Sequence, residues 1–213
     1  MSDAIKAANK KQIECIIKNL ERRNMAGYYC ENMEDAYDTV MSLIADDTVV
    51  GWGGSSTLSE IGIKEGLRER KLTVIDPYSM SDPKESMAAK IRLLRSDSFL
   101  MSTNAITLDG ELVNIDGSGN RVAALCFGPK QVIVVVGANK IVESEKHAIS
   151  RIKTQSCPPN AIRLKKQTPC GVTGKCTECL VPGETMCCTT MVTRFSNVPK
   201  RIKVILVNEN LGY

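Results

Sequence analysis

The chain has 213 residues, 43% of them hydrophobic, which is enough for one domain with a full core. No apolar run approaches the roughly 20 residues that span a bilayer, and the charged N-terminal segment lacks the apolar stretch of a secretion signal. Residues 1–120 carry 14 Lys and Arg against 19 Asp and Glu, whereas residues 121–213 carry 14 against 5. These features predict a cytoplasmic protein whose basic second half either attracts an anionic partner or forms a solvated surface.

Helices and strands alternate along the first half of the chain. Apolar residues spaced three and four apart indicate helices, and short continuous apolar runs indicate buried strands. In chain order we expect a helix over 3–24, a helix over 31–45, a strand over 47–52, a helix over 55–70, a strand over 72–75, a helix over 83–94 and a strand over 98–101.

The second half opens with a segment that is rich in Asn, Asp and Gly. Residues 103–121, TNAITLDGELVNIDGSGNR, combine these polar residues with regularly placed apolar ones, which indicates a hairpin and a glycine-rich turn. We then expect a helix over 120–127, a strand over 131–136, a helix over 144–153 and a final strand over 203–207.

The order of these elements predicts an α/β fold. Because the apolar runs of the strands are continuous rather than alternating, we expect a mostly parallel sheet covered on both faces. No internal repeat or clean boundary interrupts the pattern. We therefore expect a single domain over 1–213, with an N-terminal helical segment over 1–45 and an irregular, cysteine-rich insertion over 155–190.

A glycine- and hydroxyl-rich turn follows the first predicted strand. Its residues are Gly53, Gly54, Ser55, Ser56 and Thr57, and they lead into a predicted helix with Ser55 or Ser56 as its N-cap. Such a turn suits a phosphate or carboxylate, because glycines permit close approach and helix N-termini offer free N–H groups. The turn matches neither the P-loop nor the dinucleotide fingerprint. The alternative is a tight turn without a ligand.

Acid–base chemistry would have to rely on carboxylates, since the chain has only one His. That residue, His147, is expected to be a solvated helix residue, so a Ser-His-Asp triad is not expected. Asp109 and Asp116 are the candidates in the hairpin, with Glu111 and Glu60 near them in the predicted arrangement. Each Asp could instead be a turn residue that bonds its own backbone.

Five of the nine cysteines cluster between residues 170 and 188. Cys176 and Cys179 have the spacing that lets two thiolates face one metal ion, and Cys170 with Cys187 could complete a tetrahedral site. Zinc or an iron–sulfur cluster would then help a segment with few apolar residues to fold. Free or redox-active thiols and disulfides are the alternatives. A zinc knuckle beside a basic face would also suit nucleic acid, although the few aromatic residues argue against it.

Several of these segments together resemble a known family. The run TNAITLDGELVNIDGSGNRVAALCFGPKQVIVVVG, the cluster TPCGVTGKCTEC and the terminal ILVNENLGY are similar to the LUD-domain family of lactate utilisation proteins. The resemblance implies a Rossmann-like three-layer sandwich of the NagB/RpiA/CoA-transferase type. It also implies that the Gly53–Thr57 turn binds an anion, and that an opposite wall holds the remaining ligand-binding residues, which are Asn104, Asn114, Asp116, Asn120 and Arg121.

The resemblance implies a role in lactate utilisation. The chain would be an accessory protein or subunit of a system that oxidises L-lactate to pyruvate, with iron–sulfur proteins as partners. The alternative is a stand-alone isomerase- or transferase-like enzyme that binds a small phosphorylated or acyl-CoA substrate, although Glu111 is a poor match for a transferase nucleophile. No flavin or NAD motif is present. The apolar faces of the first two helices suit either a core or a homo-oligomer.

Overall fold

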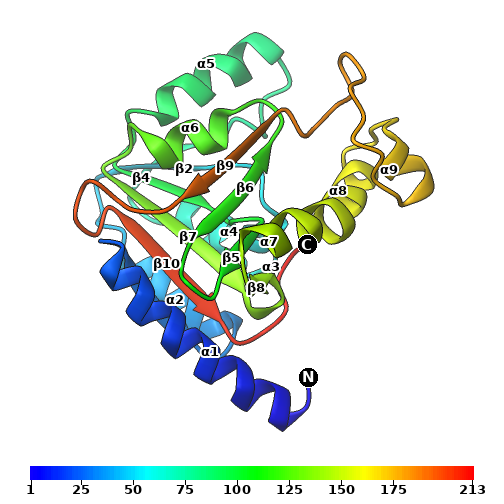
Figure 1. Ribbon diagram of the computed structural model, residues 1–213. Helices are drawn as coiled ribbons and strands as arrows, with labels where there is room; N and C mark the ends of the chain where they lie inside the picture. The colour runs from blue at the N-terminus through cyan, green and yellow to red at the C-terminus, as the bar shows by residue number, and fades with distance from the viewer.

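A six-stranded sheet forms the centre of the computed structural model, which describes residues 1–213 (Figure 1). Its strands follow the order β1-β10-β7-β4-β2-β3, and every neighbouring pair is parallel. The strands are β1 (Ala26–Cys30), β2 (Val49–Trp52), β3 (Thr73–Ile75), β4 (Ser98–Met101), β7 (Gln131–Gly137) and β10 (Ile202–Val207). The predicted parallel α/β sheet is therefore confirmed.

Helices cover both faces of this sheet and give three layers. One face packs against α1 (Asp3–Arg22), α5 (Pro83–Leu93) and α6 (Asn120–Cys126). The other face packs against α2 (Met33–Ser42), α3 (Ser56–Glu60) and α4 (Ile63–Arg68). The central strand β7 contributes apolar residues alternately to the two cores, which is why its sequence is apolar.

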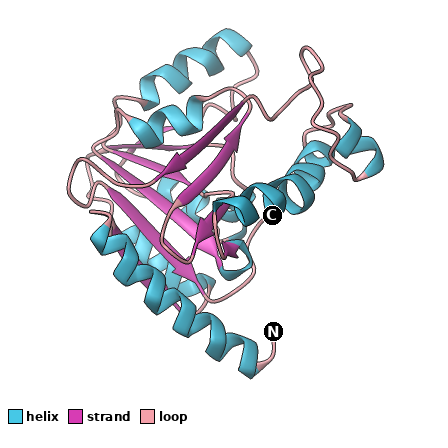
Figure 2. Cartoon of the chain, in the orientation of Figure 1, coloured by secondary structure: helices cyan, strands magenta, loops and turns pink.

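A second, four-stranded sheet lies against the first face (Figure 2). Its order is β8 (Ile141–Val142), β5 (Ala105–Thr107), β6 (Leu112–Asp116) and β9 (Thr189–Thr193). The predicted hairpin is confirmed as the antiparallel pair β5–β6, in which Ala105 faces Val113. A third apolar cluster joins this sheet to α7 (Glu145–Arg151) and α8 (Cys157–Arg163).

Some elements differ from the sequence-based expectation. Strands β1, β8 and β9 were not predicted, and the helix expected over 55–70 is divided between α3 and α4. Gly62 causes that division, because its backbone is left-handed with φ of 70°.

The helix expected over 144–153 continues further than predicted. It passes through a π-helical turn (Ile152–Ser156) into α8, which places Pro158 in the first turn of α8, where a missing N–H is tolerated. After α8 comes α9 (Pro169–Thr173), so residues 155–190 contain two helices that their sequence did not indicate.

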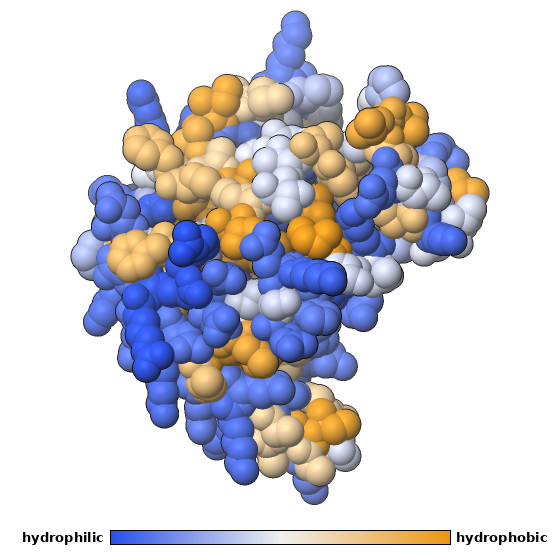
Figure 3. Space-filling view, viewed as in Figure 1, coloured by the Kyte–Doolittle hydropathy of each residue, from blue (hydrophilic) through white to orange (hydrophobic).

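The lobe formed by α9 and the loop after it carries exposed apolar side chains. Val172 and Leu180 are the most exposed of these, and Figure 3 shows apolar atoms on this lobe at the right of the view. No helix of the chain combines the length and apolar character needed to cross a membrane.

Candidate functional site

A cleft of about 830 Å³ opens beyond the carboxyl ends of β2 and β4. This is the end of a parallel sheet at which ligands usually bind. Its wall on the first sheet consists of Gly54, Ser55, Ser56 and Thr57. The opposite wall includes Asn104, Asp116, Asn120 and Arg121. The structure therefore brings together most of the residues that the sequence analysis assigned to one anion-binding site.

The turn after β2 is shaped by its caps and glycines. The Ser55 hydroxyl accepts a hydrogen bond from the Leu58 N–H at 3.2 Å, so Ser55 is the N-cap of α3. Gly53 is buried and does not line the cleft, and a Cβ there would lie 3.2 Å from the Arg121 Cγ. Gly53 thus serves the packing of Arg121. Because α3 has only five residues, its dipole is small.

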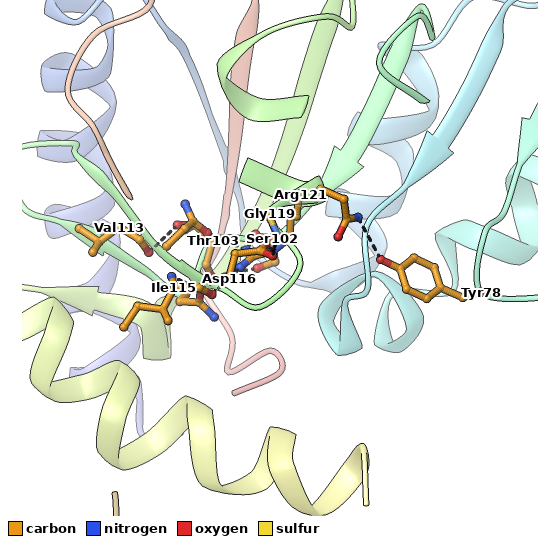
Figure 4. Close-up of polar contacts among 11 residues, drawn as sticks. Tyr78, Ser102, Thr103, Val113, Ile115, Asp116, Gly119 and Arg121 are labelled. Atoms are coloured by element: carbon orange, nitrogen blue, oxygen red, sulfur yellow. Dashed lines mark hydrogen bonds and ion pairs between the residues drawn. The ribbon is translucent and has the colours of Figure 1, made fainter. Parts of the chain in front are cut away.

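Arg121 organises the opposite wall, as Figure 4 shows. Its guanidinium donates to the Asp116 Oδ2 at 3.1 Å, to the Asn114 Oδ1 at 2.6 Å and to the Asn104 Oδ1 at 3.0 Å. It also donates to the backbone oxygens of Ser102 and Ile115, each at 3.0 Å. These five hydrogen bonds match the five N–H groups of the side chain, so Arg121 contributes charge to the cleft and holds its neighbours in place.

Asp116 is held from two sides at the end of β6. Its Oδ1 accepts from the Gly119 N–H at 2.8 Å and its Oδ2 accepts from Arg121. Asn114 is fully buried behind this wall, where its Nδ2 has no hydrogen-bond partner, and it does not line the cleft. Asn120 does line the cleft, and its Nδ2 donates to the Tyr78 hydroxyl at 3.4 Å.

Asp109 does not line this cleft. It precedes β6, whereas Asp116 ends that strand, so the length of the strand separates the two residues. The Asp109 backbone oxygen accepts from the Arg23 Nε at 2.7 Å, and Glu111 beside it forms a 3.3 Å salt bridge with Arg23. This hairpin turn borders a different hollow, lined also by Arg22 and Arg194. The structure therefore does not bring Asp109 and Asp116 together as a pair.

Lys140 is the buried lysine of the cleft, and the sequence analysis missed it. It is 3% exposed, and its Nζ donates to the Thr57 Oγ1 at 2.8 Å and to the Ser102 Oγ at 3.0 Å. Burial, together with a smaller effect of the nearby Arg151 guanidinium, lowers the pKa of its ammonium to about 7. Its position three residues after the strand ending at Gly137 was a usable signal, because that strand end faces the cleft.

Positive charge exceeds negative charge around the cleft floor. Arg151 is 6% exposed and donates to the backbone oxygens of Asn104 and Asn139 and to the Ser156 hydroxyl. Neither Arg151 nor Lys140 takes part in a salt bridge, and Asp116 is the one buried carboxylate. Since buried charges are ordinarily paired, the cleft is suited to an anionic ligand.

The cysteine segment borders the same cleft through Cys157 and the loop before β9. The Cys157 and Cys187 sulfurs lie 3.4 Å apart, and the hydrogen bond between them raises the pKa of Cys157 and lowers that of Cys187. No group of three or more His, Cys, Asp or Glu side chains is arranged to hold a metal ion. Cys170, Cys176, Cys179 and Cys187 are thus not assembled as a four-ligand site, and zinc or an iron–sulfur cluster there stays a prediction.

His147 has the role expected of it. It is exposed on α7, where its Nδ1 lies 2.9 Å from the Ser144 hydroxyl and 3.6 Å from the Glu143 carboxylate. It does not line the cleft.

Comparison with known proteins agrees with this fold. The structure resembles the crystal structure of a DUF162 family protein from Deinococcus radiodurans, with a TM-score of 0.52 and 16% sequence identity, over 95% of this chain and 98% of that one. At this identity the likeness shows the fold alone. Among curated proteins no sequence matches. The model of the LUD domain matches residues 13–207. The chain therefore belongs to the LUD-domain family.

Proposed function

We propose that the chain binds a small carboxylate in this cleft and serves a lactate utilisation system. Membership of the LUD family associates it with lactate utilisation. A surplus of buried positive charge supports an anionic ligand, because Arg121 and Lys140 line the cleft and Arg151 lies behind it, against Asp116 alone. A carboxylate would supply the charge that this set lacks.

The rim of the cleft favours the same class of ligand. Lys64 on α4, Arg163 on α8 and Lys166 after it all line the opening, whereas Glu60 is the one acidic residue of the rim. Lys64 and Arg163 lie close enough that the charge of Arg163 helps to lower the pKa of Lys64, after the larger effect of burial. Two cations on different helices therefore face one opening, an arrangement that attracts anions.

Calorimetric titration tests this proposal. We expect L-lactate and pyruvate to bind the wild-type protein, and Lys140→Met to weaken both by about tenfold or more, which corresponds to about 1.4 kcal/mol. The matched control is Lys146→Met, which removes an exposed lysine of α7. Absence of heat with either carboxylate, or equal affinities for the two variants, would contradict the proposal.

The place of the chain in the system is that of an accessory protein or subunit in the oxidation of L-lactate to pyruvate, beside iron–sulfur proteins. The absence of a flavin or NAD motif from the sequence supports this role, because the electrons would then have to pass through partner proteins. Deletion of the gene should abolish growth on L-lactate while growth on pyruvate continues. Normal growth on lactate would refute the role.

A stand-alone isomerase- or transferase-like enzyme is the alternative. The volume of about 830 Å³, which is large for lactate, favours it, because a sugar phosphate or part of an acyl-CoA would fill more of the cleft. A thermal-shift panel separates the two proposals. Stabilisation by sugar phosphates or CoA esters, without stabilisation by lactate and pyruvate, would favour the enzyme.

A further inference from the structure

We propose that the Lys140 amine forms an imine with the carbonyl carbon of a small anionic carbonyl compound bound in the cleft. The inference deepens the proposed function and rests on it for the charge of the ligand. It assigns Lys140 a covalent role that electrostatic attraction alone would not require.

The surroundings of the Lys140 nitrogen are those of a nucleophilic amine. The nitrogen is held by two hydroxyl groups, those of Thr57 and Ser102, and by no carboxylate. Hydroxyl groups can accept a hydrogen bond from either the ammonium or the neutral amine, so both forms fit the same position. A carboxylate partner would instead favour the charged, unreactive form.

Burial and the nearest cation act in the same direction. Arg151 disfavours the ammonium form of Lys140 more than the exposed Glu60 favours it, and Arg121 adds a smaller effect that disfavours it. A lysine that is desolvated and placed beside other cations is the arrangement that activates an amine for attack on carbonyl groups. The neutral amine is therefore available near neutral pH, whereas an ordinary surface lysine becomes available only near pH 10.

Lys140 also has access to a ligand although it is almost fully buried. It lines the cleft together with Thr57 and Ser102, which follow the neighbouring strands β2 and β4. The cations of the rim, Lys64 and Arg163, would hold the anionic group of the ligand while its carbonyl reaches the floor. The ligand class is thus a carbonyl compound with a carboxylate or a phosphate.

The bond changes balance without a further reactant. The amine nitrogen attacks the carbonyl carbon to form a carbinolamine, and a proton passes from nitrogen to oxygen. The C–O bond then breaks, a C=N bond forms, and the carbonyl oxygen leaves as water with the two hydrogens that the amine carried. No oxidant or reductant takes part. Hydrolysis returns the free lysine and the ligand.

Reductive trapping tests the inference on the full-length protein. Pyruvate or dihydroxyacetone phosphate is added with cyanoborohydride at pH 7, and the adduct is mapped by peptide mass spectrometry. We expect one adduct per chain, on Lys140, with a trapping rate that rises steeply between pH 6 and pH 8. Lys140→Arg should abolish it, whereas Lys146→Arg, an exposed matched control, should leave it unchanged. L-lactate, which has no carbonyl, should give no adduct and should slow trapping by competition.

The outcomes separate this inference from the proposed function. An adduct with pyruvate supports both. An adduct with dihydroxyacetone phosphate alone supports the imine and counts against the carboxylate ligand. Calorimetric binding of pyruvate without an adduct, or adducts spread over surface lysines, overturns the imine and leaves the carboxylate site standing. If pyruvate neither binds nor forms an adduct, both the imine and the carboxylate site are overturned. Mapping on the wild-type chain decides the matter even if Lys140→Arg fails to fold.

Discussion

Replacement of Arg121 by Met should destabilise the protein strongly. The side chain is 12% exposed, its partner Asp116 is 7% exposed, and five oxygen atoms depend on its N–H groups. Removal of one partner of a buried ion pair costs about 3–5 kcal/mol, because the remaining charge is left unpaired. We take about 4 kcal/mol as the expected loss in the free energy of unfolding. For a chain of this size that corresponds to a decrease in Tm of roughly 10 °C.

Urea unfolding followed by tryptophan fluorescence would measure this loss. The single tryptophan, Trp52, is 1% exposed and lies on β2 beside the cleft, so its emission reports on this region. Lys71→Met is the control, because the Lys71–Asp47 pair is exposed and its loss should change stability by less than about 0.5 kcal/mol.

A double variant separates the effect of charge from that of packing. Asp116→Asn removes the carboxylate that Arg121→Met would leave unpaired, so the combined loss should be smaller than the sum of the single losses by about 1–3 kcal/mol. A loss below about 1 kcal/mol for Arg121→Met, or additive losses in the double variant, would refute the account of this wall.

Three further predictions concern the amine, the thiols and the glycines. Folding lowers the pKa of Lys140 from 10.5 to about 7, so the unfolded chain binds more protons than the folded chain between these pH values. The stability of the wild type should therefore rise with pH over that window relative to Lys140→Met. Parallel pH profiles of the two proteins in urea unfolding would contradict this. Diamide should join Cys157 to Cys187, whose sulfurs are 3.4 Å apart, so peptide mapping should find that disulfide in the wild type and none in Cys157→Ser; a disulfide elsewhere in the wild type would count against it. Gly128→Ala should prevent folding, because φ is 114° and a Cβ would lie 2.3 Å from the Leu94 backbone oxygen. Gly62→Ala, with φ of 70° and open space around the position, should cost only about 1 kcal/mol of stability by thermal melting. Equal losses for the two variants would contradict the role given to the close approach at Gly128.

The sequence predicted the architecture well because most strands have continuous apolar runs. The continuous apolar runs in β7 and β10 predict buried strands, and both strands are buried along nearly their whole length. Strand β1, with the sequence AGYYC, was missed because it lies at the edge of the sheet, and four of its five residues are only half-buried. Strand β9 has the sequence TTMVT and is also an edge strand, so its apolar content is low.

The candidate site was predicted in outline. The Gly54–Thr57 turn and the Asn104, Asp116 and Asn120 wall could be inferred, because glycines, hydroxyls and amides at strand ends have few other uses. The role of Lys140 could not be inferred from composition. Its place just after a strand end was the one local signal, whereas its burial depends on Ser102 and Thr57, which lie 38 and 83 residues away along the chain.

The roles of Arg121 and Asp109 show a second limit. The sequence assigned Arg121 to the ligand, yet all its N–H groups have protein acceptors, and that saturation depends on the backbone oxygens of Ser102 and Ile115. Asp109 and Asp116 are near in sequence, but a strand in an extended conformation separates them. Spacing along a chain predicts proximity in a helix much better than in a hairpin.

The position of β10 has a consequence for synthesis of the protein. This last strand lies between β1 and β7, so β1 has no partner within the main sheet until residues 202–207 are present. In the second sheet, β6 likewise gains its second neighbouring strand only when β9 is present. The Asp116 backbone oxygen at the end of β6 accepts a hydrogen bond from the N–H of Cys188, which directly precedes β9. A ribosome that has made only the first 180 residues holds a chain in which β7 and β6 each lack a neighbouring strand on one side. The cleft is thus completed only after β9 and β10 have been translated, and exposure to chaperones or proteases before that moment should depend on how fast these two strands emerge.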